Sequence, residues 1–283
     1  MRVGGGVVSR LLRAGESPVL VRAWQPAGNR VVLRAEPVDP VAVAAPRAVP
    51  PLSSRPAGPA QLRLAVERMR FALGVDDDLG EFYRRFRRDP LLGPLLRRRP
   101  WLRLRRRPFA WEALAWAVVK QLIETERAAR IQRRIVGRWG SRLGRDRGAL
   151  RDVPAAATIA GRAPAELTAM DLSPGRAIAL RAAAREIAAG RCDPADPGGD
   201  KRLLAIPEIG PWTVQCLGLF GRGDPDSLPA GDLIYLKLVG RLARLGRRAT
   251  VEEVEEFYAP YAPFRGLAGL WTIGLLRAYP PAG

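Results

Sequence analysis

The chemistry open to this chain is limited by the residue types that it lacks. It contains no histidine and two cysteines, Cys192 and Cys216. The absence of histidine excludes Ser-His-Asp and Cys-His nucleophilic sites, histidine metal sites and imidazole acid–base catalysis near neutral pH. Two cysteines cannot by themselves supply a four-thiolate zinc or iron–sulfur site. Any reaction must therefore depend on carboxylates, aromatic rings, amides or backbone groups.

The segment from Leu204 to Val214 could bind an anion through its backbone. An apolar helix end meets Pro207 there, a tight turn follows at Ile209-Gly210, and a new helix begins at Pro211. The start of a helix exposes unpaired N–H groups and the positive end of the helix dipole, so a phosphate can dock there. Short turns between helices are also common without any function. Composition alone leaves both interpretations open.

A carboxylate with a marked position follows twenty residues beyond Trp212. Asp232 comes after Ser227-Leu-Pro-Ala-Gly and before the apolar segment Leu233-Ile-Tyr-Leu-Lys. An aspartate between a loop and an apolar helix is most often an N-cap, because its side chain accepts hydrogen bonds from the N–H groups of the first turn. From the residues alone, Asp232 is predicted to begin a helix.

Together, the hairpin and the aspartate resemble the helix-hairpin-helix DNA glycosylase superfamily, and within it the DNA-3-methyladenine glycosylase II family. The shared pattern is Pro-x-Ile-Gly-x-x-Thr at residues 207–213, followed by Asp232 in a Pro-x-x-Asp setting. The similarity extends over residues from about 60 to 280, roughly three quarters of the chain. Residues 109–123 are similar to the family's helix that leads to its DNA wedge, and residues 163–190 to the helix pair before the hairpin.

The resemblance implies a monofunctional DNA glycosylase of base excision repair. Such an enzyme flips an alkylated purine, 3-methyladenine or 7-methylguanine, out of DNA and hydrolyses its N-glycosidic bond. Asp232 would be the catalytic carboxylate, a role compatible with a cap because capping fixes the carboxylate at the edge of the cleft. An alkylated purine carries positive charge and leaves readily, so one carboxylate that stabilises an oxocarbenium-like sugar and admits water suffices without histidine. Trp212 stands where lyase-competent relatives place a Schiff-base lysine, so the expected product is an abasic site.

The same resemblance assigns the residues that would receive the flipped base. Trp212 would form a wall of the pocket, where an electron-rich ring favours a cationic purine. Cys216 and Phe264 fall where relatives carry a tyrosine and a tryptophan, so the lesion spectrum stays open. Leu122 would be the wedge that fills the gap in the duplex, with Gln121 beside it at the base pocket and near the partner strand. By helical spacing alone, Leu122 belongs to the core.

The hairpin itself would hold the DNA backbone. The resemblance assigns this contact to Pro207, Glu208, Ile209, Gly210 and Thr213. It also implies a structural monovalent cation, Na or K, and no required cofactor; the cation would bind the backbone carbonyls of Leu204, Ile206 and Ile209. Glu208 stands where the family has glycine, although a non-glycine residue at positive φ is costly and a carboxylate repels phosphate. Either the backbone avoids that conformation, or the phosphate is held more weakly.

The charge of the chain favours a polyanionic partner. The 47 Lys and Arg residues exceed the 28 Asp and Glu residues by 19, and all but three of the 47 are arginine. A nucleic acid or an anionic membrane surface fits this charge, although a nucleotide bias of the genome also produces arginine. Eleven arginines and one acid, Asp89, lie between residues 84 and 107. This stretch is predicted to be either a phosphate-binding strip or a solvated face between two helices. With the resemblance, the expected partner is damaged double-stranded DNA, bound by a monomer.

No segment of the sequence predicts membrane attachment. The first ten residues are interrupted by glycine and arginine, so they lack the core of a signal peptide. No uncharged apolar run approaches the roughly 20 residues that span a bilayer. We therefore expect a cytoplasmic, nucleoid-associated prokaryotic protein.

The predicted fold is mainly α, with two helical subdomains flanking a DNA-binding cleft and a small β-rich N-terminal region. Residues 18–24 and 30–35 are predicted to form a β-hairpin, and a segment this short must pack against residues later in the chain. Seven prolines between residues 36 and 60 indicate a linker. The predicted division is residues 1–60, then 61–107 with 225–283 carrying the catalytic Asp, and 108–224 ending in the hairpin. Helices are predicted at 61–73, 77–88, 109–123, 127–139, 174–190, 211–220, 232–245, 250 onward and 264–279.

Two alternative functions stay open. Glu208 and Cys216 depart from the family pattern, so a non-catalytic DNA-binding or damage-sensing relative is one. A glycosylase for deaminated or oxidised purines is the other.

Overall fold

The N-terminal part of the chain is an antiparallel sheet. The structure, a computed structural model, describes residues 2–39, 43–44, 56–144 and 149–277. Four strands pair in sequence order: β1 (Arg2–Gly4), β2 (Val7–Ala14), β3 (Ser17–Trp24) and β4 (Val32–Pro37). The predicted hairpin is confirmed, since β3 and β4 pair with Val21 opposite Ala35. The first two strands were not predicted; glycines at positive φ, Gly5, Gly6 and Gly15, form the turns on either side of β2.

The sheet buries one face against the first helix of the chain. Helix α1 (Pro59–Leu73) places Ala65 and Met69 against Leu12 and Val21 of the sheet. The short β segment therefore packs against a later element, as expected. Helix α1, which falls in the 61–107 segment of the predicted division, packs with the sheet.

A larger group of helices, which we call the hairpin lobe, surrounds the first half of the candidate site. It comprises α4 (Ala110–Lys120), α5 (Thr125–Trp139), α6 (Ala156–Ala160), α7 (Pro164–Thr168), α8 (Pro174–Ala188), α9 (Asp200–Leu204), α10 (Pro211–Leu217) and the π-helix η3 (Gly218–Arg222). Leu114, Val118 and Ile131 are fully buried in its core. Helix α4 is buried along nearly its whole length, so it is the central element that the others cover.

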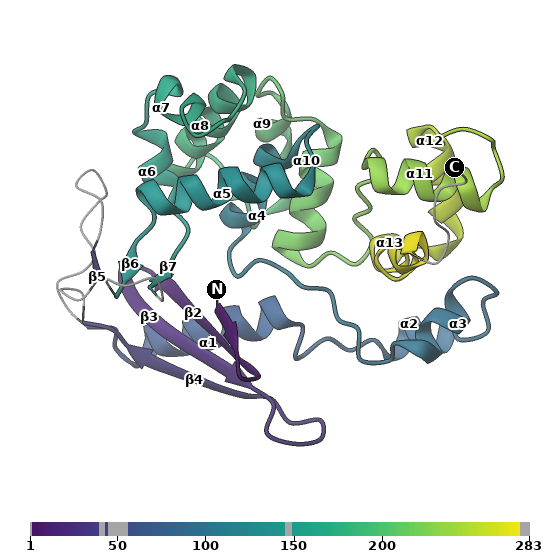
Figure 1. Ribbon diagram of the computed structural model, residues 1–283, viewed down its shortest axis with the longest axis horizontal. Helices are drawn as coiled ribbons and strands as arrows, with labels where there is room; N and C mark the ends of the chain where they lie inside the picture. Colours follow the sequence, from purple (N-terminus) through teal and green to yellow (C-terminus); the bar gives the residue numbers. More distant parts are fainter. Residues whose placement is uncertain (1, 40–42, 45–55, 145–148, 278–283) are drawn as a thin grey trace.

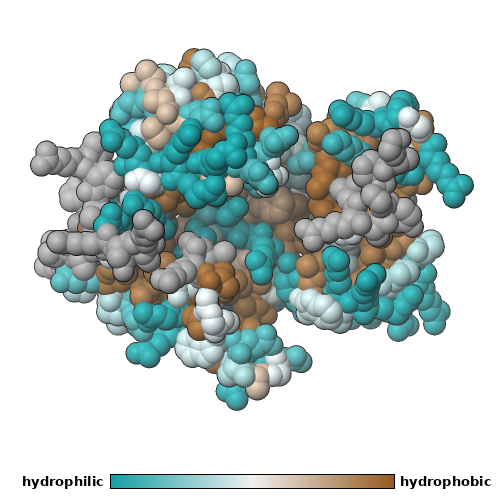
Figure 2. Space-filling model, viewed as in Figure 1, coloured by the Kyte–Doolittle hydropathy of each residue, from teal (hydrophilic) through white to brown (hydrophobic). Residues whose placement is uncertain are grey.

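A second group, which we call the aspartate lobe, is assembled from two separate stretches of chain. It comprises α2 (Gly80–Phe86), α3 (Leu92–Arg98), α11 (Leu233–Leu242), α12 (Val251–Tyr258), η4 (Ala259–Tyr261), α13 (Arg265–Thr272) and η5 (Ile273–Arg277). Phe82 and Trp271 meet in its core at 5.3 Å between ring centroids. The chain crosses to this lobe, returns to α4, and crosses again before α11 (Figure 1). Figure 2 shows hydrophobic side chains along the edge of this lobe that faces α10. The mainly α fold with a small β-rich N-terminal region is confirmed.

Helix ends follow the predicted signals in part. Thr250 and Glu253 form a capping box at the start of the helix predicted from residue 250, and Gly190, at φ 68°, follows the end of α8. Helix α10 ends at Leu217 and continues as a π-helix, so the predicted 211–220 helix is shorter than expected. The predicted 264–279 helix ends as α13 at Thr272, and its last two residues lie outside the described part of the chain.

The proline-rich stretch is described only in part. Strand β5 (Val43–Ala44) pairs with β6 (Arg142–Leu143), which pairs with β7 (Leu150–Arg151). The linker prediction for residues 40–42 and 45–55 lies outside the described residues. Among the helices that the structure describes, none has the length and apolar composition needed to cross a membrane.

Candidate functional site

Asp232 caps a helix and faces the hairpin lobe at the same time. It is the N-cap of α11, and its Oδ1 accepts a hydrogen bond from the backbone N–H of Ile234 at 3.0 Å. Its Oδ2 accepts a hydrogen bond from Nε1 of Trp212 at 3.3 Å. The predicted cap is confirmed. Because both oxygens have donors, the half-buried carboxylate is held in one orientation at the junction of the two lobes.

Trp212 reaches Asp232 because of where α10 begins. Gly210 is extended, at φ −107° and ψ −177°, and Pro211 starts the helix, which places Trp212 on its first turn. The loop before Asp232 approaches the indole closely, since a side chain added at Gly231 would meet the Trp212 ring at 3.9 Å. The structure thus brings together the two residues that the resemblance paired across twenty positions.

Two buried groups near this pair, Cys216 and Tyr235, stay neutral. Cys216, one turn after Trp212, is buried, and desolvation raises the pKa of its thiol far above the usual range, with a further contribution from the charge of Asp232. Tyr235, on α11, is also buried, and desolvation raises the pKa of its phenol well above 10.0. Neither group ionises near neutral pH, so Asp232 supplies the negative charge here.

Leu122 stands out of the molecule just after α4. Its side chain is 102% exposed relative to a free residue, and its backbone lies at φ 52°. The interpretation from helical spacing, which put Leu122 in the core, is wrong because α4 ends at Lys120 and the chain turns there. An exposed leucine in a strained backbone conformation is a feature that folding alone does not favour.

The loop that carries Leu122 is fixed by hydrogen bonds on both sides. Gln121 donates through Nε2 to Oγ1 of Thr213 at 2.9 Å and to the carbonyl of Glu208 at 2.6 Å. Arg176 donates from Nη1 to the carbonyls of Gln121 and Val119, at 3.0 and 3.3 Å. The predicted wedge, pocket glutamine and hairpin are therefore one connected unit.

Glu208 adopts the backbone conformation that glycine would favour. Its φ is 70°, so the backbone adopts the conformation that is costly for a non-glycine residue. The alternative that the backbone avoids this conformation is therefore excluded. Its carboxylate lies against the first turn of α8, where a side chain on Gly175 would come within 2.9 Å of Oε1. The positive end of the α8 dipole stabilises a carboxylate at this place. Desolvation lowers the pKa of the neighbouring Arg176, and the charge of Glu208 opposes that shift.

The hairpin turn presents its tip to solvent. Pro207 and Glu208 are exposed, and the N–H of Ile209 donates to the carbonyl of Ile206 at 3.0 Å. Within the described part of the chain, no group of three or more His, Cys, Asp or Glu side chains could hold a metal ion. The implied cation would use only carbonyls, those of Leu204, Ile206 and Ile209, and the one at Ile206 already accepts the N–H of Ile209. This cation site stays a prediction.

Phe264 packs against the core of the aspartate lobe. Its ring packs edge-on against Phe82 at 5.6 Å and Phe86 at 6.4 Å between centroids, in the core of the aspartate lobe. Those core rings, rather than Trp212, are its ring partners among the described residues. The assignment of Phe264 to the base pocket stays a prediction. Tyr235 and Trp271 are buried in the core of the same lobe.

The arginine-rich stretch has two kinds of members. Arg106 is held inside the protein by the carbonyl of Phe71 at 2.9 Å and by an ion pair with Asp77. Arg107 donates to the buried Glu112 at 3.4 Å. The remaining side chains include exposed ones, namely Arg84, Arg85, Arg87, Arg88, Arg97, Arg98, Arg99 and Arg105. Structural ion pairs thus account for part of the stretch, and the exposed members are free for either predicted role.

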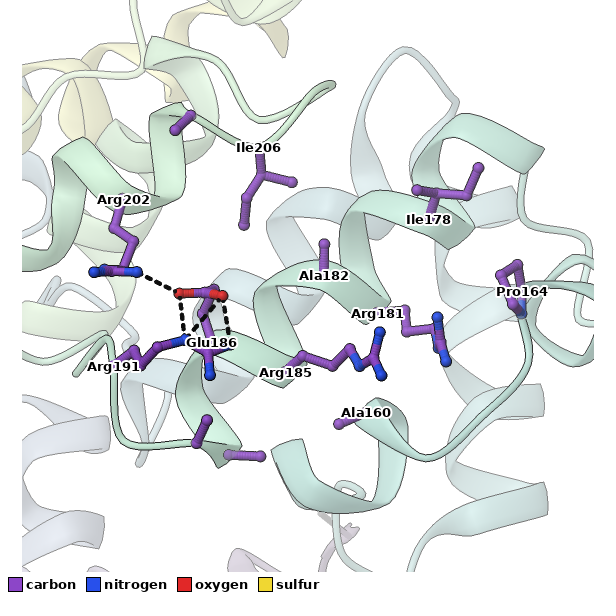
Figure 3. Close-up of a pocket in the computed structure, with 13 residues that line it drawn as sticks. Ala160, Pro164, Ile178, Arg181, Ala182, Arg185, Glu186, Arg191, Arg202 and Ile206 are labelled. Atoms are coloured by element: carbon purple, nitrogen blue, oxygen red, sulfur yellow. Dashed lines mark hydrogen bonds and ion pairs between the residues drawn. The ribbon is translucent and has the colours of Figure 1, made fainter.

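A cavity of about 860 Å³ lies beside α8 (Figure 3). Glu186 accepts hydrogen bonds there from Arg191 at 2.7 Å and Arg202 at 2.9 Å. These two partners hold the pKa of the Glu186 carboxyl at about 2. Neither Asp232 nor Trp212 lines the cavity, which reaches the hairpin at Ile206.

Sequence reasoning missed two residues of this region. Arg176 positions the wedge loop, and the sequence pattern predicted only that it lies in the 174–190 helix. Lys120 ends α4 immediately before Gln121. Its signal was available, because the chain has only three lysines and one of them adjoins the predicted wedge.

Comparisons with known proteins agree with the geometry. No protein-family model matches the sequence. Over 176 residues the chain is 30% identical to the "probable bifunctional transcriptional activator/DNA repair enzyme AlkA" of Mycobacterium tuberculosis, covering 61% of this chain and 35% of that protein. Over 184 residues it is 25% identical to the DNA-3-methyladenine glycosylase of Bacillus subtilis, covering 63% of this chain and 61% of that one. The chain thus spans between a third and two thirds of these relatives.

The fold comparison covers nearly the whole chain. The solved structure of the 3-methyladenine DNA glycosylase from Archaeoglobus fulgidus matches 98% of this chain and 89% of its own, with a TM-score of 0.79 at 20% identity. The chain therefore has the fold of the helix-hairpin-helix DNA glycosylases and is similar in sequence to DNA-3-methyladenine glycosylases, which confirms the resemblance inferred from the hairpin and Asp232.

Proposed function

We propose that this protein is a monofunctional DNA glycosylase that removes alkylated purines, such as 3-methyladenine and 7-methylguanine, from duplex DNA. The observation that carries the proposal is the carboxylate of Asp232, oriented by Trp212 across the junction of two lobes. The relatives named as 3-methyladenine glycosylases support the substrate class. A repair glycosylase also gives the basic charge of the chain a partner, since duplex DNA is a polyanion.

The reaction needs little more than this carboxylate. The C1′–N9 bond breaks with its electron pair going to the base, so a cationic purine leaves as a neutral molecule. Asp232 stabilises the positive charge that develops on the sugar, because its fixed carboxylate needs no reorganisation during the reaction. Water then adds at C1′ and loses a proton, which leaves an abasic site. The carboxylate can accept that proton.

The surrounding residues serve to hold the opened DNA. Leu122 would fill the space vacated by the base, because its apolar side chain is exposed and its loop is anchored by Gln121 and Arg176. The first turn of α10 offers backbone N–H groups to a phosphate of the same strand. In the hairpin, Pro207, Ile209, Gly210 and Thr213 would contribute this contact. A monovalent cation held by the turn carbonyls would add positive charge beside that phosphate.

A base-release assay over a panel of alkylated, deaminated and oxidised duplexes tests this function. The proposal predicts release of 3-methyladenine or 7-methylguanine and no strand cleavage, since Trp212 cannot form a Schiff base. Tight binding of the duplexes without release of any base would contradict it. That outcome would favour the damage-sensing alternative, for which Glu208 and Cys216 are the specific observations.

A further inference from the structure

Lys120 is a cation that the proposed reaction does not use. It is the last residue of α4, directly before Gln121 and Leu122. Its side chain is exposed, and it forms no salt bridge with a described residue. A ligand that enters beside Trp212 can therefore meet a free ammonium group.

The packing of α4 determines which way Lys120 points. A side chain added at Gly221 would meet Ala113 at 2.8 Å and Ala110 at 3.2 Å, so this face of α4 lies on the segment that continues α10. Lys120 follows Ala113 by seven residues, which is two helical turns, and so it shares that face. The hydrogen bond from Gln121 to Thr213 fixes this end of α4 against the first turn of α10.

The groups around Lys120 are those of the candidate pocket. Desolvation is the largest influence on Lys120 and lowers its pKa, with Arg107 acting in the same direction. The charge of Asp232 acts in the opposite direction, and Lys120 in turn opposes the rise of the Cys216 pKa. Because Cys216 stays a neutral thiol, Asp232 is the anionic group next to Lys120, and Lys120 is the cationic group that adjoins the wedge loop.

This charge balance bears on which damaged bases are accepted. A pocket lined by a carboxylate alone attracts a purine with a formal positive charge, whereas an added ammonium opposes that attraction. A neutral purine, such as hypoxanthine, leaves with negative charge on the base, and it presents O6 and N7 as acceptors. An ammonium group donates to such acceptors and stabilises that charge as it develops.

We infer that Lys120 is a specificity-determining residue of the base pocket, which shifts selectivity from cationic alkylated purines toward neutral ones. The inference rests on the proposed function, because it assumes that the base enters beside Trp212 and Asp232. The inference also defines the substrate class more closely. Lys120 should speed release of a purine that presents acceptors at O6 and N7, and should slow release of a 7-alkylated cationic purine.

Single-turnover release from two duplexes tests the inference, one with 7-methylguanine and one with hypoxanthine. Lys120→Gln is expected to raise the rate ratio of 7-methylguanine to hypoxanthine by on the order of tenfold. Lys120→Arg keeps the charge and should hold the ratio within about twofold of the wild type. The matched control is Lys237→Gln, an exposed lysine on α11, which should leave the ratio unchanged.

A binding measurement separates failure of this inference from failure of the proposed function. The affinities for the same two duplexes are measured for the single variant Asp232→Asn and for the double variant that also carries Lys120→Gln. The ratio of the affinity for the 7-methylguanine duplex to that for the hypoxanthine duplex should be several-fold higher in the double variant. An unchanged ratio in both assays, or an equal shift in Lys237→Gln, overturns the role of Lys120. A wild type that releases neither of these bases nor 3-methyladenine contradicts the proposed function, and the affinity ratio then still tests the role of Lys120.

Discussion

The indole nitrogen of Trp212 donates a hydrogen bond to Oδ2 of Asp232 at 3.3 Å, which joins the first turn of α10 to the first residue of α11. The bond runs between two lobes that have separate hydrophobic cores. It therefore ties the orientation of the carboxylate to the position of the hairpin. In the proposed function, the element that would hold the DNA backbone also positions the group that acts on the sugar.

Trp212→Phe tests this coupling because it keeps an aromatic wall and removes the donor. A hydrogen bond to a charged group contributes about 1.5–3 kcal/mol, so base release should slow by roughly ten- to a hundredfold. The affinity for abasic-site DNA should change little. Single-turnover release and a binding titration measure the two quantities, and equal release rates for the variant and the wild type would show that the bond has no role.

Glu208→Gly should tighten binding to abasic-site DNA and stabilise the fold. The substitution removes a carboxylate that adjoins the expected phosphate contact at Ile209 and lies against the first turn of α8. It also places glycine at φ 70°, where relief of strain contributes on the order of 1 kcal/mol. Glu208→Gln is the matched control, since it removes the charge and keeps the strained backbone. Titrations at fixed salt and thermal unfolding separate the two effects; unchanged or weaker affinity for Glu208→Gly counts against this account of the hairpin.

Leu122→Ala should impair base release without destabilising the protein. The side chain is fully exposed, so its loss creates no cavity, but the opened duplex loses the group that would fill it. Leu114→Ala is the structural comparison, because Leu114 is fully buried and its truncation should cost about 2–5 kcal/mol of unfolding free energy. The expected result for Leu122→Ala is loss of base release with an unchanged Tm. An equal drop in Tm for both variants would mean that Leu122 contributes to the packed core and would contradict this role.

Asp152 should make the stability of the protein depend on pH in the acid range. Burial raises the pKa of this carboxyl from 3.8 to about 6, the charge of Arg10 opposes the shift, and Glu112 adds to it. The folded state therefore retains the proton to higher pH than the unfolded chain. The stabilisation is complete below the unfolded pKa and is lost as pH rises through about 6.

Asp152→Asn removes the titrating carboxyl, so comparison of the variant with the wild type measures how much this group makes the unfolding free energy depend on pH. Between pH 4 and pH 7, the unfolding free energy of the wild type should fall by about 2 kcal/mol relative to that of the variant. Denaturant titrations at several pH values give the difference. A difference that stays constant across this range would mean that Asp152 does not titrate there.

The sequence predicted the elements of the site that depend on local structure. The turn at Ile209-Gly210 and the cap at Asp232 are set by neighbouring residues, so their signals lie within a few positions. Phe264 could not be placed in this way, because its ring partner Phe82 lies far away in sequence and only the folded lobe brings the two together. Motif position alone therefore assigned it to the pocket.

Leu122 and Lys120 show a second limit of sequence patterns. Helical spacing predicts the core only while the helix continues, and α4 ends at Lys120, before the predicted boundary at 123. The end of the helix turns Leu122 outward at φ 52° and leaves Lys120 on the face toward α10. No residue in this segment is a strong helix breaker, so the turn depends on the hydrogen bonds that Gln121 and Arg176 make with distant elements.

The role of Asp232 is the central claim, and one substitution tests it most directly. Asp232→Asn keeps an N-cap side chain and removes the negative charge; Asp89→Asn, at another helix start where Oδ1 accepts from the N–H of Leu91 at 2.9 Å, is the control. Release of 7-methylguanine from methylated duplex is measured under single-turnover conditions alongside DNA binding. We predict that Asp232→Asn binds DNA with near wild-type affinity and releases at least about a hundredfold less base, while Asp89→Asn stays active. Equal release by Asp232→Asn and the wild type would contradict the account.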